Sequence, residues 1–564
     1  MDANRPALRR LSWLWLWLLP LAFLGFFFFQ PLAAILRLAA EGALADGLRF
    51  DAWTRLGRPL LFTIWQAGLS TLLTLLVGLP AAWVFARFNF PGKRLISTLS
   101  TLPFILPTVV AAAGFNALLG PRGWVNLALM DWFNLTTPPV QFLNSLGAIL
   151  LAHVFYNTTV VLRVVGSAWA QMDTRLEQAA RSLGAAPLRA FWEVTLPLLR
   201  PPLAAAALLV FLFDFTSFGV ILLLGGPQYA TLEVEIYIQA LHLLNLPLAG
   251  LLSAVQLIAT LVLTALYARL ARGRNIPLTP RLRGEAQRAP RRSWERLVVG
   301  VTVGGLVLLM ALPLTALALR SVTRLEADRG QRGAVQTGLT LDYYRELFVN
   351  RRGAFFYVPP AEAARNSLTY AGLTVVISLG LGFLAAGALA RRSKLNAVLD
   401  PLLMLPLGAS AVTLGLGFVV VFSRPPLDVR SFPLLIPIAH SLVALPFVVR
   451  TLQPALASIP PGLRQAAAVL GAPAWRVWLE VDLPIVARAA AASAVFAFTI
   501  SLGEFGATTF LARPETPTLP VAIFRFLSQP GALNYGQALA MATLLMLLCA
   551  AAVLLLERLE KVLG

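Results

Sequence analysis

Two similar stretches show how this chain is organised: QAARSLGAAPLRAFWEVTLPLLRP at residues 178–201 and QAAAVLGAPAWRVWLEVDLPIVAR at residues 465–488. Both are charged and amphipathic, in a chain whose residues are 58% hydrophobic and only 13% charged. A soluble protein of 564 residues rarely has so apolar a composition, because its surface has to be polar. The chain is therefore predicted to be an all-α polytopic membrane protein that is interrupted twice by a similar segment.

Long apolar segments occur throughout the chain. A helix needs about 20 such residues to cross the hydrocarbon core of a bilayer. The first set lies near 11–38, 59–86, 97–119, 145–170, 202–224 and 248–270, and the second near 297–319, 366–390, 399–422, 433–457, 486–511 and 537–556. We therefore expect about twelve transmembrane helices, six in each half.

The two halves of the sequence form an internal repeat. At an offset of 287 residues (440 minus 153), His153 aligns with His440 and Gly184 with Gly471, and at an offset of 304 (371 minus 67) a segment from Ala67 aligns with one from Ala371. With six spans each, the halves face the same way, as parallel repeats do. The predicted division is a first half at 1–271, a basic cytoplasmic linker at 272–296 and a second half at 297–564.

The formal net charge of +20 follows membrane topology. The excess is mostly Arg in short segments beside apolar runs, and such segments stay on the cytoplasmic side. The prediction is a multi-pass protein of the plasma or inner membrane with both termini in the cytoplasm, in contact with lipid and not with nucleic acid. Both quoted segments then also lie on the cytoplasmic side.

Several chemistries find no support in the sequence. The single cysteine, Cys549, rules out a disulfide within the chain and a cysteine-based metal site. The only GK pair, Gly92-Lys93, has Arg87 where a phosphate-binding loop needs its first glycine. We therefore predict no catalytic residue, no metal ligand and no cofactor bound by this chain.

Each quoted segment predicts a helix, a turn and a second short helix. In the first, residues 174–183 favour a helix, Gly184 suits its left-handed end, and Pro187 suits the first turn of the next helix. That second helix is expected to end near Glu193, before Leu196-Pro197. A single such segment could be an amphipathic helix lying on lipid, but two matched copies favour docking of a partner with two equivalent sites.

These segments resemble the EAA loop of the membrane-spanning subunits of binding-protein-dependent ABC importers. The family pattern is Glu-Ala-Ala, a Gly four residues later and a Leu-Pro further on, and both copies here have Gln in place of Glu. The matching residues are Gln178, Ala179, Ala180 and Gly184 in the first copy and Gln465, Ala466, Ala467 and Gly471 in the second. Segments 150–165, 215–237 and 500–524 are similar to the fused-permease branch that serves ferric iron or thiamine importers.

The resemblance implies partners and a mechanism. Two copies of a cytoplasmic ATPase subunit, which carries the ATP and Mg, would bind the two loops, and an extracytoplasmic solute-binding protein would deliver the substrate. ATPase closure would then rock the halves between two states. Polar contacts with the ATPase are expected from Arg189 and Glu193 in the first loop and from Arg476 and Glu480 in the second.

Two acidic residues lie in predicted spans, where an ionised side chain is costly and usually functional or buried in protein. Asp214 aligns with Ser501, and Glu504 aligns with Ser217. These four residues are the candidates for lining a translocation path; the alternative is that each acid is a hydrogen-bonded structural carboxyl. His153 and His440 could suggest a metal, but packing or hydrogen bonding between helices is favoured.

A proton-coupled secondary transporter with twelve helices is the alternative function, because helix number and repeat orientation agree with it. Such a carrier needs no docking loop after its fourth helix and usually has coupling acids in several helices. A membrane scaffold is a weaker third alternative, because it gives no reason for two matched cytoplasmic loops.

Overall fold

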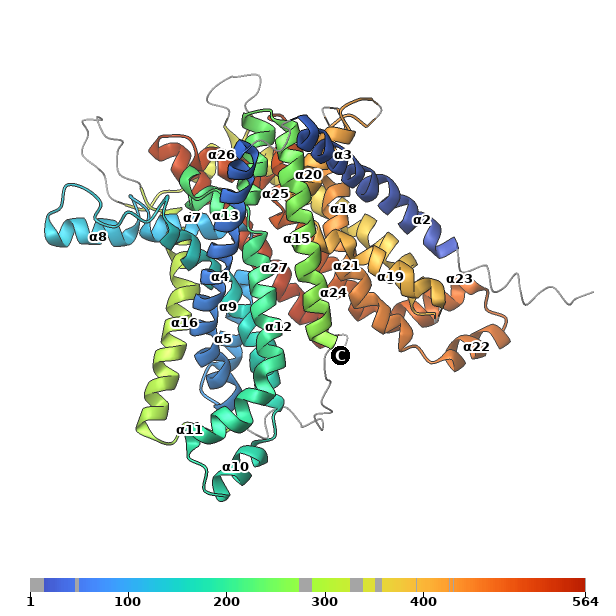
Figure 1. The fold of residues 1–564 in the computed structure, drawn as a ribbon, viewed down its shortest axis with the longest axis horizontal. Helices are drawn as coiled ribbons and strands as arrows, with labels where there is room; N and C mark the ends of the chain where they lie inside the picture. Colours follow the sequence, from blue (N-terminus) through green and yellow to red (C-terminus); the bar gives the residue numbers. More distant parts are fainter. Residues whose placement is uncertain are drawn as a thin grey trace, which may run out of the picture. The chain divides into compact units, whose positions relative to one another are not determined.

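The computed structural model describes residues 15–45, 50–272, 287–324, 338–349, 358–391, 393–425, 427–429 and 431–562. Within these ranges the chain is helical, and its only β pairings are isolated bridges between Phe88 and Arg288 and between Thr323 and Leu339 (Figure 1). Residues 1–14 and most of the predicted linker, 273–286, lie outside the described part.

The helices that precede residue 287 are α2 (Trp15–Leu24), α3 (Gln30–Ala45), α4 (Phe50–Arg87), α5 (Lys93–Leu99), α6 (Leu102–Ile105), α7 (Thr108–Leu119), α8 (Trp124–Phe133), α9 (Leu146–Gln171), α10 (Thr174–Ser182), α11 (Pro187–Ala190), α12 (Leu196–Phe215), α13 (Gly219–Leu224), α14 (Leu232–Tyr237) and α15 (Leu246–Arg272). Those that follow are α16 (Ser293–Arg320), α17 (Asp342–Arg345), α18 (Pro360–Leu389), α19 (Lys394–Gly408), α20 (Ala411–Val421), α21 (Leu435–Ala457), α22 (Pro461–Val469), α23 (Ala474–Val477), α24 (Leu483–Gly503), α25 (Gly506–Leu511), α26 (Leu519–Leu527) and α27 (Ala532–Val562).

The prediction of an all-helical membrane protein is confirmed. Among the described residues, ten helices are long and apolar enough to cross a membrane, and two bent pairs raise the number to twelve if each pair is one span. The bends are 109° between Ile105 and Thr108 and 95° between Gly408 and Ala411. They fall within the third and ninth predicted spans, at Pro107, which has no N–H to donate, and at Ser410, whose side chain caps α20.

Two further predicted spans, the fifth and the eleventh, are also interrupted. The sequence predicted single helices over 202–224 and 486–511, but α12 ends at Phe215 and α24 ends at Gly503. After each end the backbone leaves the helical path for a few residues before α13 or α25 begins. Polar contacts at these two breaks, described below, stabilise the non-helical backbone.

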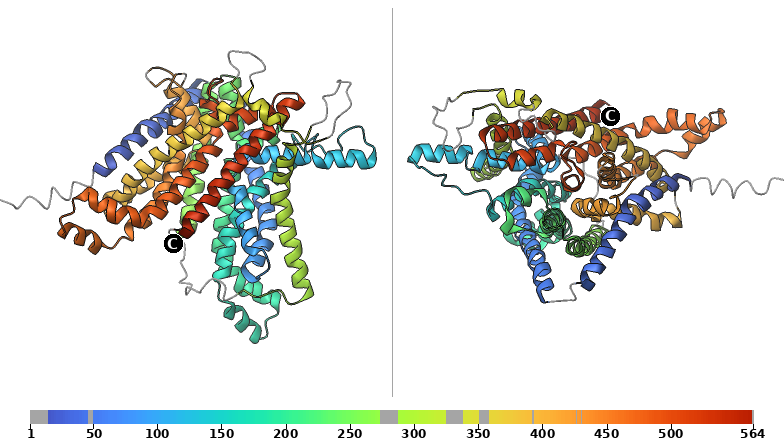
Figure 2. Two further views of the ribbon diagram at one scale, coloured as in Figure 1. Left: turned by 180° about the vertical axis from the view of Figure 1, so that it is seen from behind. Right: turned by 90° about the horizontal axis from the view of Figure 1, so that it is seen from above.

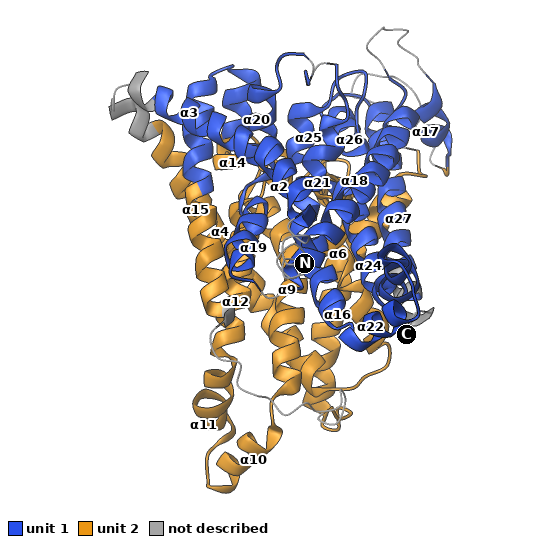
Figure 3. Ribbon diagram, turned by 90° about the vertical axis from the view of Figure 1, so that its right-hand side faces the viewer, with its two compact units in different colours: residues 1–47, 236–257, 340–564 blue, residues 48–235, 258–339 orange. Residues whose placement is uncertain are grey.

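The described chain divides into two compact units (Figure 3). Unit 1 comprises residues 1–47, 236–257 and 340–564, and unit 2 comprises 48–235 and 258–339. The first helical segment, α2 with α3, thus belongs to the unit that contains α18 to α27, and α16 belongs to the unit that contains α4 to α13. The predicted halves, 1–271 and 297–564, stay a prediction, because spatial compactness does not test where a sequence repeat begins.

Within unit 1, α18 packs against α21 and α24, and α2 packs along α18 (Figure 2). Phe27, in the π-helical turn between α2 and α3, lies against Phe418 and Phe422 of the α20 segment, with ring centroids 6.4 Å and 5.8 Å away. Within unit 2, α4 packs against α9 and α12, and α16 packs against α7.

One close helix contact recurs in both units. A Cβ on Gly114 of α7 would lie 2.9 Å from the carbonyl oxygen of Pro313 on α16, and a Cβ on Gly417 of α20 would lie 2.8 Å from the Cβ of Pro31 on α3. Small residues allow such close approach between membrane helices. A glycine and a proline therefore join the first helix of each half to a bent span of the other half.

Candidate docking elements and a buried polar network

The first quoted segment forms a helix that ends in a glycine turn. Asp173 caps the start of α10 by accepting a hydrogen bond from the Arg175 amide at 2.9 Å. At the other end Gly184 has φ +90°, and the Ala185 amide donates to the Ala180 carbonyl at 3.0 Å. This is the Schellman geometry, in which a left-handed residue ends a helix.

The second segment repeats that geometry. Gly471 has φ +81° after α22, and the Ala472 amide donates to the Ala467 carbonyl at 3.0 Å. Only glycine adopts such backbone angles routinely, because a Cβ would clash. The prediction that a helix ends at a left-handed glycine and that a second helix follows is confirmed in both copies.

The prediction that Leu196-Pro197 ends the second helix is wrong. A π-helical turn, Phe191–Thr195, leads from α11 into α12, and the Leu196 amide donates to the Phe191 carbonyl five residues earlier. In the second copy the turn is Trp478–Asp482, and the Leu483 amide donates to the Trp478 carbonyl. The wider turn accommodates a proline that can neither donate a hydrogen bond nor fit the carbonyl of an α-helical turn.

The turn between the helices is exposed in both copies. Leu183 is 90% exposed, and the aligned Leu470 is 87% exposed. Exposed ion pairs follow on the second helices, Arg189 with Glu193 at 2.8 Å and Arg476 with Glu480 at 2.7 Å. Gln178 and Gln465 are exposed as well, so both copies present the same combination of apolar, amide and charged groups.

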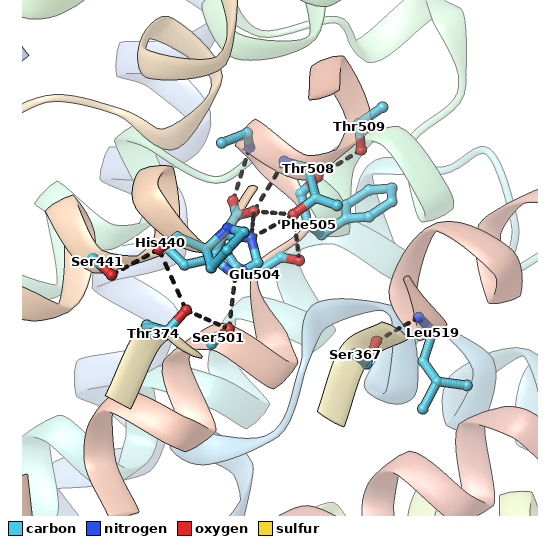
Figure 4. A network of polar contacts seen from close by, with 12 residues as sticks. Ser367, Thr374, His440, Ser441, Ser501, Glu504, Phe505, Thr508, Thr509 and Leu519 are labelled. Carbon is cyan, nitrogen blue, oxygen red and sulfur yellow. Dashed lines mark hydrogen bonds and ion pairs between the residues drawn. The ribbon is translucent and has the colours of Figure 1, made fainter. Parts of the chain in front are cut away.

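A buried polar network surrounds Glu504 (Figure 4). One carboxylate oxygen accepts from the Ala507 amide at 2.8 Å, and the other accepts from the Thr508 amide at 2.9 Å. His440 of α21 lies with Nε2 3.2 Å from that second oxygen and Nδ1 2.7 Å from the Ser501 hydroxyl. Glu504 therefore caps α25 and joins the break after α24 to a neighbouring helix.

The corresponding network in unit 2 surrounds Asp214. Its Oδ1 accepts from the Asn157 amide group at 2.7 Å and lies 3.3 Å from Nδ1 of His153. Nε2 of the same imidazole lies 2.8 Å from the Ser217 hydroxyl. The Gln66 side chain donates to the Asp214 backbone carbonyl at 2.9 Å.

The two networks are related by exchange of acid and serine. In each, Nδ1 of the histidine faces the position occupied by Asp214 or Ser501, and Nε2 faces the position occupied by Ser217 or Glu504. The prediction that the histidines bond between helices is confirmed. Whether the four aligned residues line a path stays a prediction, since each is held here by contacts within its own unit.

The sequence analysis did not identify several participants, among them Asn157 and Thr508. Neither polar group is repeated in the aligned position, which holds Ala444 for the first and Ile221 for the second. Asn157 follows His153 by one helical turn, and Thr508 follows Glu504 by one turn. This spacing on a predicted span was the signal that could have identified them. Within the described residues, no three His, Cys, Asp or Glu side chains gather closely enough to hold a metal ion.

Comparison with known families decides the class of the protein. Residues 75–275 and 378–563 match the binding-protein-dependent transport system inner membrane component. The chain belongs to this family. It is thus a multi-pass inner membrane permease of a binding-protein-dependent ABC importer, the non-catalytic component that works with an ATPase and a binding protein, and the proton-coupled carrier is excluded.

Individual relatives cover different parts of the chain. The thiamine transport system permease protein ThiP of Brucella abortus (strain 2308) is 28% identical over 547 residues, 96% of this chain and 94% of the relative. ThiP of Escherichia coli (strain K12) is 28% identical over 86% of each chain. The permease protein PhnU of Salmonella paratyphi A, whose name links it with 2-aminoethylphosphonate transport, is 34% identical over 49% of this chain and 96% of its own length.

Proposed function

We propose that this permease imports thiamine, driven by two copies of an ATPase subunit that bind its two helix–glycine–helix elements. The observation that carries the docking part is the repetition of one exposed geometry, from the Schellman turn at Gly184 or Gly471 to the ion pair that follows it. Two equivalent elements suit two copies of one partner. The two ThiP relatives, which match 96% and 86% of this chain, support thiamine over ferric iron.

The docking elements connect directly to the spans that carry the buried acids. The stretch Pro187–Phe215 is one long helix apart from its π-helical turn, and so is Ala474–Gly503. A displacement of either short helix is therefore passed along a stiff element to Asp214 or to Glu504. This continuity supports rigid-body rocking driven by the ATPase.

Asp214 and Glu504 would make the translocation path favourable for a positively charged substrate. Thiamine carries a permanent positive charge, and a buried carboxylate stabilises a cation in a medium of low dielectric constant. Asp214, Ser217, Ser501 and Glu504 are proposed to contact the substrate when the polar networks open. ATP and Mg are proposed to stay on the partner subunit, and both termini are proposed to face the cytoplasm.

Reconstitution tests this proposal. The permease, its ATPase and a binding protein are placed in proteoliposomes, and ATP hydrolysis and uptake are measured with thiamine, 2-aminoethylphosphonate or ferric iron on the binding protein. Of the three substrates, we expect only thiamine to stimulate ATP hydrolysis. Thiamine should accumulate in the vesicles only when ATP is supplied. Stimulation by 2-aminoethylphosphonate or iron without any by thiamine would overturn the substrate assignment, and uptake without ATP would overturn the energy source.

A further inference from the structure

The two docking helices are anchored differently within the chain. The Arg87 guanidinium, at the end of α4, pairs with the Glu177 carboxylate on α10, and both side chains are about three-quarters buried, at 25% and 27% exposure. In the second copy Arg464 occupies the position aligned with Glu177, and it pairs with Asp482 of the following π-helical turn at 2.8 Å. The first helix is thus fixed to a different span, and the second is fixed to its own continuation.

The backbone around Arg87 is held from two sides. The Lys93 ammonium donates to the carbonyls of Phe85 and Phe88, each at 2.6 Å, so it caps the end of α4. Arg288 of the linker pairs with the same turn: its amide donates to the Arg87 carbonyl at 3.2 Å, and the Asn89 amide donates to the Arg288 carbonyl at 2.9 Å. Arg87 therefore cannot shift without disturbing both contacts.

Arg288 is in turn fixed to the start of α16. The Arg288 guanidinium makes two hydrogen bonds to the Glu295 carboxylate, at 3.0 Å and 2.6 Å, and lies 5.3 Å from the centre of the Phe88 ring. This bidentate pairing raises the pKa of Arg288 above its ordinary value and keeps the side chain charged. Glu295 also accepts from the amides of Arg291 and Arg292, so its carboxylate orders the start of the helix.

We propose that Arg87 is a positioning residue for the first docking helix, and that the linker between the halves holds it in place. A continuous series of contacts then runs from α16 through Glu295, Arg288 and Arg87 to Glu177 on α10. The described end of the linker, through Arg288 and Glu295, is thereby tied to the first docking helix. The two ATPase copies meet elements of equal shape but unequal stiffness, an inference that rests on the proposed docking function.

Site-specific cross-linking tests this inference. The only native cysteine, Cys549, is buried and is replaced by Ala, and single cysteines are introduced as Leu183→Cys or as Leu470→Cys, two aligned and exposed positions. Each cysteine carries a benzophenone maleimide, and cross-linking to the ATPase is measured in the assembled complex. Arg87→Ala is compared with Arg391→Ala, the aligned exposed arginine of the second half.

We expect Arg87→Ala to lower cross-linking from position 183 by about threefold, as for loss of a partly exposed ion pair, and to leave position 470 unchanged. Arg391→Ala should change neither. The exchanged pair, Arg87→Glu with Glu177→Arg, should restore cross-linking from position 183, which a role in folding alone does not predict.

Two results would overturn the inference: equal loss at both positions, or no loss at position 183 in Arg87→Ala. Failure of the exchanged pair to restore cross-linking would also contradict it. If the two cysteine variants with Arg87 intact cross-link to the ATPase from neither position, the docking function itself fails. The two failures are therefore distinguishable.

Discussion

At the scale of single residues, Glu504 replaces a helical turn with side-chain contacts. Its carboxylate accepts two backbone amides and the Thr508 hydroxyl, and it faces His440, although the residue is only 8% exposed. A buried acid is tolerated only when its oxygens are hydrogen-bonded. Glu504 therefore provides acceptors for two of the backbone amides at the start of α25, just after the break.

Replacement of that carboxylate should destabilise the protein strongly. Glu504→Leu leaves the buried amides of Ala507 and Thr508 without an acceptor, and each unsatisfied donor costs about 1–3 kcal/mol. Glu504→Gln retains one acceptor and should cost less. Thermal unfolding of the purified permease measures the effect, with Glu515→Leu at an exposed position as the control. An unfolding temperature equal to that of the control would contradict the capping role.

At the scale of elements, the recurrent glycine–proline contact explains how the first helix of each half packs. Gly114 and Gly417 lie where an added Cβ would meet a neighbouring backbone or proline ring closer than 3.0 Å. In an open helix position, alanine is favoured over glycine by about 0.5–1 kcal/mol. The sign of the change in the free energy of unfolding on Gly→Ala substitution therefore shows whether the close contact exists.

We expect Gly114→Ala and Gly417→Ala to lower the free energy of unfolding, because overpacking a close contact costs about 1–3 kcal/mol. Gly300→Ala on α16 should leave it unchanged or raise it, because nothing lies within 4 Å of that Cβ. Thermal unfolding in one detergent compares the three variants. Stabilisation by all three substitutions would show that the helices do not approach this closely.

At the scale of the whole molecule, local sequence signals predicted the helices and glycine turns, whereas contacts between helices determine where spans break and which helices pack together. The helix–glycine–helix elements could be predicted, because Gly184 and Gly471 determine the backbone by themselves. The breaks at Phe215 and Gly503 could not, because they depend on side chains of other helices, such as His440. Nor does any local pattern show that α16 packs on α7.

The predicted orientation of the chain in the membrane can be tested by labelling the two turns. Maleimide that cannot cross a membrane should label Leu183→Cys and Leu470→Cys in inside-out vesicles and not in right-side-out vesicles, because both turns are predicted to be cytoplasmic. The buried Cys549 should stay unlabelled in both preparations. Labelling of either turn from the outer side would reverse the predicted topology.

The central claim is that the two glycine turns hold the ATPase, and binding of the ATPase to a variant with both turns altered tests it most directly. In Gly184→Val with Gly471→Val, a β-branched side chain opposes the left-handed backbone, at φ +90° and +81°, by about 1–2 kcal/mol at each turn. The control is Gly531→Val, another glycine of positive φ, in the turn before α27. We expect the ATPase to be lost from the double variant during co-purification and to stay bound to the control. Full retention of the ATPase by the double variant would show that the glycine turns do not hold it.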